Sequence, residues 1–169
     1  MEIFRIAEEK YASSLTASGI AGRWNEDNEL VIYTASSRAL GTLEKIIRFN
    51  TINPKVLYKV MVLFVPDNPD FITEIKISKL PTNWREKSAY PDLRSIGSKW
   101  YFNKKSLILK VPSAVITKEF NYIINTKHPD FGQVKLSLME DYFFDERLIE
   151  MNTPTTKSQK KINKTKTKK

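Results

Sequence analysis

The sequence predicts a single α+β domain with a mostly antiparallel or mixed sheet. Its 169 residues match the usual size of one domain, and no linker rich in Gly, Pro or Ser divides them before residue 153. Segments typical of strands outnumber those typical of helices. The two kinds are not regularly interleaved along the chain, which argues against a doubly wound parallel sheet.

Strands are expected where β-branched and aromatic residues gather between turn residues. They cover residues 2–7, 29–34, 56–65, 71–77, 106–111, 121–125, 133–138 and 143–148.

Two helices are expected from apolar residues at helical spacing. The first covers residues 38–50 and begins after Ser36 and Ser37, either of which can cap it. The second covers residues 91–101, with Asp92 as its cap.

The net charge of +9 is concentrated at the end of the chain. Residues 154–169 hold seven lysines and no acid, so residues 1–153 carry only +2. We expect residues 1–153 to be the folded domain and residues 154–169 a disordered, Lys-rich tail. Such a tail binds phosphates weakly and in a salt-dependent way. A basic nucleic-acid-binding module is therefore kept as an alternative function, with no specific nucleic-acid partner expected.

Several kinds of chemistry are excluded by what the chain lacks. It has no Cys and a single His, which leaves no thiolate nucleophile and no ordinary metal site, so no metal is expected. Neither glycine-rich phosphate-binding motif occurs. The longest uninterrupted apolar run, residues 60–65, is too short to span a bilayer, and we expect a cytoplasmic protein without a membrane partner.

Glu44 interrupts the apolar stripe of the first helix. Leu40, Leu43 and Ile47 occupy the i, i+3 and i+7 positions, and Glu44 stands at i+4. A carboxylate there is costly unless it is paired or used. Two interpretations follow: Glu44 pairs with Arg48 one turn later, or it points into a cleft between helix and sheet.

A second candidate group lies just before the second expected strand. Gly22, Arg23, Trp24 and Asn25 are consecutive, and an arginine can bind a pyrophosphate with two hydrogen bonds. The tryptophan fits core packing better than ligand stacking. Tyr33, near the end of that strand, fits cross-strand packing and ligand contact equally well.

Short motifs follow one another through the folded part. They are Phe4-Arg5-Ile6, Gly22-Arg23-Trp24-Asn25, Val31-Ile32-Tyr33-Thr34-Ala35, Ala39-Leu40 with Leu43-Glu44, Leu80-Pro81-Thr82-Asn83-Trp84, Ile96-Gly97-Ser98-Lys99-Trp100, Val111-Pro112-Ser113-Ala114-Val115, Asn125-Thr126-Lys127-His128-Pro129 and Phe144-Asp145-Glu146-Arg147-Leu148. In this order and spacing they resemble the RES-domain toxins, which consume NAD⁺ and are paired with an Xre-type helix-turn-helix antitoxin. The chain departs from the family at Phe4, at Thr126 and in the turn 26–29, where Asn28 replaces the usual glycine.

The resemblance implies a fold and an activity. The fold is similar to that of ADP-ribosyltransferases, with two small packed sheets and helices around a nicotinamide cleft. The activity is cleavage of NAD⁺ at the nicotinamide–ribose bond, with phosphate or water as acceptor. NAD⁺ is then the substrate and inorganic phosphate a co-substrate. The partner is the antitoxin, and the toxin is a candidate homodimer within the toxin–antitoxin complex. A transferase that places ADP-ribose on a macromolecule is the alternative enzyme.

The resemblance also implies the site residues. Arg23, Tyr33 and Glu44 are the catalytic set. The binding candidates are Arg5, Asn25, Ser113, Asn125 and His128. Three of these have structural alternatives: Ser113 as a cap after a proline, His128 as a turn residue before a proline, and Arg5 as an ion-pair partner.

Overall fold

The computed structural model describes residues 1–49, 53 and 55–151. Within these residues one seven-stranded mixed sheet carries three α-helices, which confirms the predicted α+β class. The strands are β1 (Glu2–Glu8), β2 (Val31–Ala35), β3 (Tyr58–Phe64), β4 (Ile72–Glu74), β5 (Ile108–Pro112), β6 (Phe120–Asn125) and β7 (Lys135–Tyr142). The helices are α1 (Arg38–Phe49), α2 (Tyr90–Asn103) and α3 (Glu146–Met151). None of these helices is long and apolar enough to cross a membrane.

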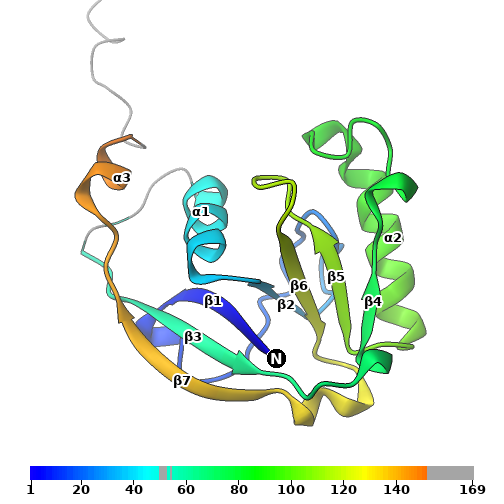
Figure 1. Cartoon of the computed structure of the whole chain (residues 1–169), viewed down its shortest axis with the longest axis horizontal. Coiled ribbons are helices and arrows are strands. Elements are labelled where there is room, and N and C mark those ends of the chain that lie inside the picture. Colours follow the sequence, from blue (N-terminus) through cyan, green and yellow to red (C-terminus); the bar gives the residue numbers. More distant parts are fainter. Residues whose placement is uncertain (50–52, 54, 152–169) are drawn as a thin grey trace, which may run out of the picture.

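The sheet has two halves that meet at one point. Its order is β4-β5-β6-β2-β1-β3-β7, and β1 pairs with β2 only through Phe4 and Ala35. The strands of the two halves run in clearly different directions (Figure 1). The two small sheets expected from the resemblance are therefore halves of one continuous sheet, in which β4 and β5 are parallel and the other described pairs antiparallel.

The two long helices cover the same face of this sheet. Ile46 of α1 packs on Ile6 of β1, and Trp100 of α2 packs in one cluster with Ile123 of β6. Paired residues point to the same face, and the strand registers place Ile6, Tyr33 and Ile123 on one side. Tyr33 thus lies on the helix-covered face, on a strand between the two packing sites.

The opposite face holds a core shared by both halves. Its buried residues are Ile3, Ala7, Ala12, Ile32, Met61, Leu63, Val65, Phe71, Leu107, Ile108, Ile124 and Val134. They include residues of strands on both sides of the junction, such as Ile3 and Met61 on one side and Ile32 and Ile124 on the other, so the core holds the halves together where the hydrogen-bonded ladder does not.

The first helix begins as predicted and packs with a slightly different face. The Ser37 hydroxyl accepts a hydrogen bond from the Leu40 N–H at 3.1 Å and caps the helix. Leu40 and Ile46 are buried, whereas Ile47, expected on the apolar face, is 56% exposed. The buried stripe is therefore rotated away from Ile47, and Glu44 lies half-buried at its margin.

The second helix begins one residue earlier than predicted, and Asp92 does not cap it. The capping position belongs to Ala89, whose side chain makes no capping hydrogen bond, and Asp92 lies in the first turn. Pro91 fits there because the backbone N–H groups in the first turn have no carbonyl partner within the helix. The N–H group that proline lacks therefore removes no helical hydrogen bond.

Two expected strands are corrected. The strand predicted over 71–77 ends at Glu74, and a 3₁₀ helix spans Ile77–Lys79. Residues 143–148, expected to be a strand, lead into α3 instead. There Asp145 accepts hydrogen bonds from the backbone and the guanidinium of Arg147, and these lower the pKa of Asp145 to about 2. Such local side-chain hydrogen bonds favour a helix start over an extended ladder.

Candidate active site

Glu44 connects α1 to the sheet. Its Oε1 atom accepts a hydrogen bond from the Ser113 hydroxyl at 2.9 Å and another from the Asn121 amide at 2.6 Å. Within the described residues it forms no ion pair with Arg48, so the surface-pair interpretation is wrong. The carboxylate points across the helix-covered face of the sheet toward β5 and β6.

Ser113 makes the turn contacts expected of a serine after a proline, and it also binds Glu44. It is completely buried at the end of β5, and its Oγ atom accepts hydrogen bonds from the N–H groups of Val115 (3.0 Å) and Ile116 (3.1 Å). These contacts form a turn typical of serine. The same hydroxyl donates to Glu44. The turn therefore fixes the serine that holds the carboxylate.

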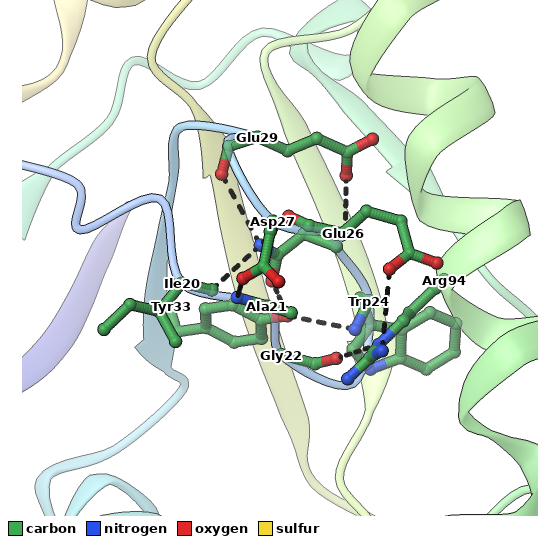
Figure 2. A network of polar contacts seen from close by, with 10 residues as sticks. Ile20, Ala21, Gly22, Trp24, Glu26, Asp27, Glu29, Tyr33 and Arg94 are labelled. Atoms are coloured by element: carbon green, nitrogen blue, oxygen red, sulfur yellow. Dashed lines mark hydrogen bonds and ion pairs between the residues drawn. The ribbon is translucent and has the colours of Figure 1, made fainter.

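Tyr33 anchors the segment that precedes its own strand. Its hydroxyl donates to Oδ1 of Asn25 at 2.8 Å and accepts from the Trp24 N–H at 3.0 Å (Figure 2). Burial raises the pKa of the Tyr33 phenol above its usual value, and the Trp24 hydrogen bond offsets this in part. The phenol is consequently a neutral donor over the physiological pH range.

Asn25 organises the turn around itself. It is 1% exposed, and its amide nitrogen donates to the carbonyls of Ile20 (3.1 Å) and Glu26 (2.9 Å). Asn28 has a φ of 68°, which confirms it as the left-handed residue of the turn. Asn25 is therefore a structural residue of this loop, with its polar atoms bound to Ile20, Glu26 and Tyr33.

Gly22 leaves room for the tyrosine. A β-carbon at this position would lie 2.5 Å from the Tyr33 hydroxyl oxygen and 2.7 Å from the Asn25 side-chain oxygen. A larger residue would displace the tyrosine that closes the loop. The glycine is thus required by a close approach.

Arg23 is oriented by residues that the sequence did not single out. Its Nη1 atom donates to the Trp84 carbonyl at 2.8 Å, and its guanidinium lies 4.7 Å from the centroid of the Tyr90 ring. On the same ring, Arg94 approaches to 5.5 Å and donates from Nε to the Gly22 carbonyl at 2.8 Å. Tyr90 and Arg94 are four residues apart at the start of α2, and this spacing could have indicated a shared face.

Positive charge also gathers around Arg48, which contacts the Tyr33 ring. The Arg48 guanidinium lies 5.7 Å from the Tyr33 ring centroid. Burial, and then the charge of Arg48, lowers the pKa of Arg5, whose Nη1 donates to the Thr16 carbonyl at 3.0 Å. Burial also lowers the pKa of Lys45; Glu8 opposes that shift, while Arg5 and Arg48 add to it. This basic cluster (Arg5, Lys45 and Arg48) produces a positive potential that suits an anionic ligand.

Asn125 and His128 lie away from this group, at the opposite end of β6 from Asn121. The Asn125 amide donates to the Tyr101 carbonyl at 2.9 Å, and its oxygen accepts from the Lys127 N–H. His128 accepts at Nδ1 from the Asp130 N–H at 3.1 Å and caps a 3₁₀ helix. The structure gives both residues turn-forming contacts.

The structure thus brings Tyr33, Arg48, Glu44 and Ser113 to the helix-covered face, and adds Asn121, which the sequence did not indicate. No group of three or more His, Cys, Asp or Glu side chains that could hold a metal occurs in the part of the chain that the structure describes.

Comparisons with known proteins agree on one family. The family model described as the RES domain matches residues 2–145. The "Prs ADP-ribosylating toxin" of Sphingobium sp. (strain YBL2) is 32% identical over 142 residues, covering 82% of this chain and 88% of the relative. A "Toxin Res" from Yersinia enterocolitica is 32% identical over 154 residues, covering 88% and 99%, and one from Pseudomonas putida is 30% identical over 150 residues, covering 88% and 100%.

A solved structure shows the same fold. It is described as the crystal structure of the M. tuberculosis MbcT-MbcA toxin-antitoxin complex, and one of its chains superposes with a TM-score of 0.67 at 17% identity. The match covers 89% of this chain and 87% of that chain.

Proposed function

This chain belongs to the RES domain family, and from that premise we propose that it is the toxin of a toxin–antitoxin system and cleaves the nicotinamide–ribose bond of NAD⁺. The observation that carries the proposal is the half-buried Glu44 carboxylate, fixed by two donors on the face that also holds Tyr33 and Arg48. The names of the relatives as toxins support the biological role.

The chemistry needs a fixed negative charge more than it needs a proton donor. In NAD⁺ the bound nicotinamide ring is a pyridinium cation. When the C–N bond breaks, the ring takes the electron pair of that bond and departs as neutral nicotinamide. The ribose that remains develops oxocarbenium character, as in glycoside cleavage. A preorganised carboxylate stabilises that cation more strongly than it stabilises the substrate. Glu44 takes this role, and the single His of the chain is then no handicap.

The cations would hold the rest of the substrate. The basic cluster, together with Arg23 and Arg94, suits the pyrophosphate of NAD⁺ and an incoming phosphate. Tyr33, neutral and fixed by its hydroxyl, would flank the nicotinamide ring. The acceptor, phosphate or water, would then form the new bond to the ribose carbon that nicotinamide leaves.

The test is nicotinamide release by the purified full chain, wild type against Glu44→Gln. Glutamine keeps an oxygen that accepts from Ser113 and Asn121, and replaces the other oxygen by an uncharged NH₂ group. We expect a loss of at least about 100-fold in kcat, with unchanged circular dichroism. Glu146→Gln, at an exposed position in α3, is the matched control and should remain fully active. A Glu44→Gln variant with wild-type turnover would refute the role of this carboxylate.

A second candidate function is transfer of ADP-ribose to a macromolecule, which the name of the Sphingobium relative favours. NAD⁺ labelled in its adenine separates the two. Cleavage leaves the label in ADP-ribose without phosphate, and in an ADP-ribose phosphate when phosphate is the acceptor. Transfer leaves the label on protein or nucleic acid. Running the assay with and without inorganic phosphate identifies the acceptor in the same experiment.

The partner that we propose is a helix-turn-helix antitoxin of the Xre type, acting in the cytoplasm. The toxin–antitoxin complex that contains a chain of the same fold supports a protein partner. Co-expression with a helix-turn-helix protein encoded beside this chain should restore growth that this chain alone arrests. Ultracentrifugation of the purified complex then decides whether it contains a homodimer of the toxin.

A further inference from the structure

The Glu44 carboxylate is held by one of its two oxygen atoms. Its two donors among the described residues, the Ser113 hydroxyl and the Asn121 amide, both bind Oε1. A carboxylate oxygen has two lone pairs, so Oε1 is saturated. Oε2 makes no hydrogen bond to any residue among 1–49, 53 and 55–151.

The donors are themselves fixed. Asn121 lies on β6 between two neighbouring strands, opposite Ala35 of β2 and Val111 of β5. Its backbone therefore belongs to a ladder on both sides. The Ser113 oxygen accepts from two backbone N–H groups, so its only proton is directed to Glu44.

We infer that Asn121 is a positioning residue for the reaction: with Ser113 it pins Oε1 and thereby presents Oε2 to the ribose as the C–N bond breaks. This inference rests on the proposed function. A carboxylate on a helix side chain of three rotatable bonds would otherwise sample many orientations, and two donors on a rigid strand remove that freedom. Asn121 itself touches Glu44 and needs no contact with the substrate.

Two variants of this residue separate positioning from packing. Asn121→Ala removes the donor. Asn121→Asp keeps the shape and replaces the donor by a carboxylate that faces Glu44 at about the same place. Two adjacent carboxylates repel, and they share a proton as the pH falls. A protonated aspartic acid then donates to Oε1 as the amide did.

The experiment measures kcat and KM for nicotinamide release from NAD⁺ between pH 5 and pH 8, for wild type, both variants and the control Asn103→Ala. Asn103 is an exposed residue at the end of α2. We expect Asn121→Ala to lower kcat by about 10- to 100-fold, the range for one hydrogen bond to a charged group, with KM little changed. The rate of Asn121→Asp relative to wild type should rise as the pH falls, while that of Asn121→Ala stays flat.

Three results would overturn this inference. They are an Asn121→Ala variant with wild-type kcat, a loss confined to KM, and an Asn121→Asp variant whose relative rate does not depend on pH. A wild-type protein that releases no nicotinamide overturns the proposed function and this inference together. An active wild type with an unaffected Asn121→Ala variant overturns the inference only.

Discussion

Gly97 of α2 lies directly against the backbone of Trp24. A β-carbon on the glycine would be 1.7 Å from the Trp24 carbonyl oxygen and 2.7 Å from its carbonyl carbon, both of them backbone atoms. The helix can approach the Arg23–Trp24 segment only because position 97 has no side chain. The same approach brings Arg94 within hydrogen-bonding distance of the Gly22 carbonyl.

Gly97→Ala should therefore damage both stability and activity. The methyl group forces α2 and the Trp24 backbone apart, and overpacking of this kind lowers the free energy of unfolding by about 1–3 kcal/mol. Because Arg23 adjoins the displaced backbone, we also expect KM for NAD⁺ to rise. Urea unfolding and nicotinamide release measure the two effects. Gly132→Ala is the control, since a β-carbon at Gly132 meets nothing within 4 Å.

Tyr33→Phe should cost stability in a pH-dependent way. The change leaves the Trp24 N–H and the Asn25 oxygen without the hydroxyl, at a cost of about 1–3 kcal/mol at pH 7. Burial raises the pKa of Tyr33 in the fold, so above pH about 10 the unfolded chain ionises this phenol while the native protein does not. The free energy of unfolding of the wild type therefore falls above this pH, and the wild type becomes less stable relative to the Tyr33→Phe variant. Urea unfolding from pH 7 to pH 10.5 should show a stability difference that shrinks with rising pH, and a constant difference would contradict the raised pKa.

Alanine substitutions at Ser98 and Ser106 should have different effects on the free energy of unfolding. The Ser98 hydroxyl is buried and has no hydrogen-bond partner among the described residues, so Ser98→Ala should leave the free energy of unfolding unchanged or raise it by up to about 1 kcal/mol. Ser106 accepts from the Trp100 indole at 2.9 Å and donates to Thr73 at 2.7 Å. Ser106→Ala should lower the free energy of unfolding by about 1–3 kcal/mol. A large loss in the Ser98 variant would show that its hydroxyl is used.

Arg48→Gln should weaken substrate binding more than turnover. It removes the guanidinium that lies over the Tyr33 ring and that lowers the pKa of Arg5. We expect KM for NAD⁺ to rise several-fold at low ionic strength and the difference to narrow in salt, since screening weakens such attraction. Lys99→Gln, which removes one exposed positive charge from α2, is the control and should leave KM unchanged.

Removal of residues 154–169 should leave nicotinamide release intact. The contacts that form the candidate site join residues between 5 and 121, and the deleted segment contributes charge. If the full chain binds nucleic acid and the shortened chain does not, the binding belongs to the lysine tail. Retention after the deletion would instead favour the nucleic-acid-binding alternative.

Local pattern was enough to predict the elements whose ends carry local signals. Ser37 and the spacing of Leu40, Leu43 and Ile47 predicted α1, and Glu44 was noticed because it interrupts that spacing. Asn121 was missed because it contacts a residue 77 positions away, and no local pattern reports which strand α1 faces. The helix α3 was missed because one side chain, Asp145, outweighs the alternation that favoured a strand.

Because β1 and β2 pair only through Phe4 and Ala35, the hydrogen bonds of Glu44 also help to hold the two halves of the sheet in place. With one paired position between the halves, the hydrogen bonds of the sheet do little to fix the angle between them, and the shared core contributes most of the resistance. Through Ile46, α1 packs on β1 of one half, and the Glu44 carboxylate ties the same helix to the end of β5 and to β6 of the other half, as a cross-brace does. A Glu44→Ala variant would lose both the catalytic charge and the contact between the two halves, so its effects could not be separated. A Glu44→Gln variant keeps the contact and removes only the charge.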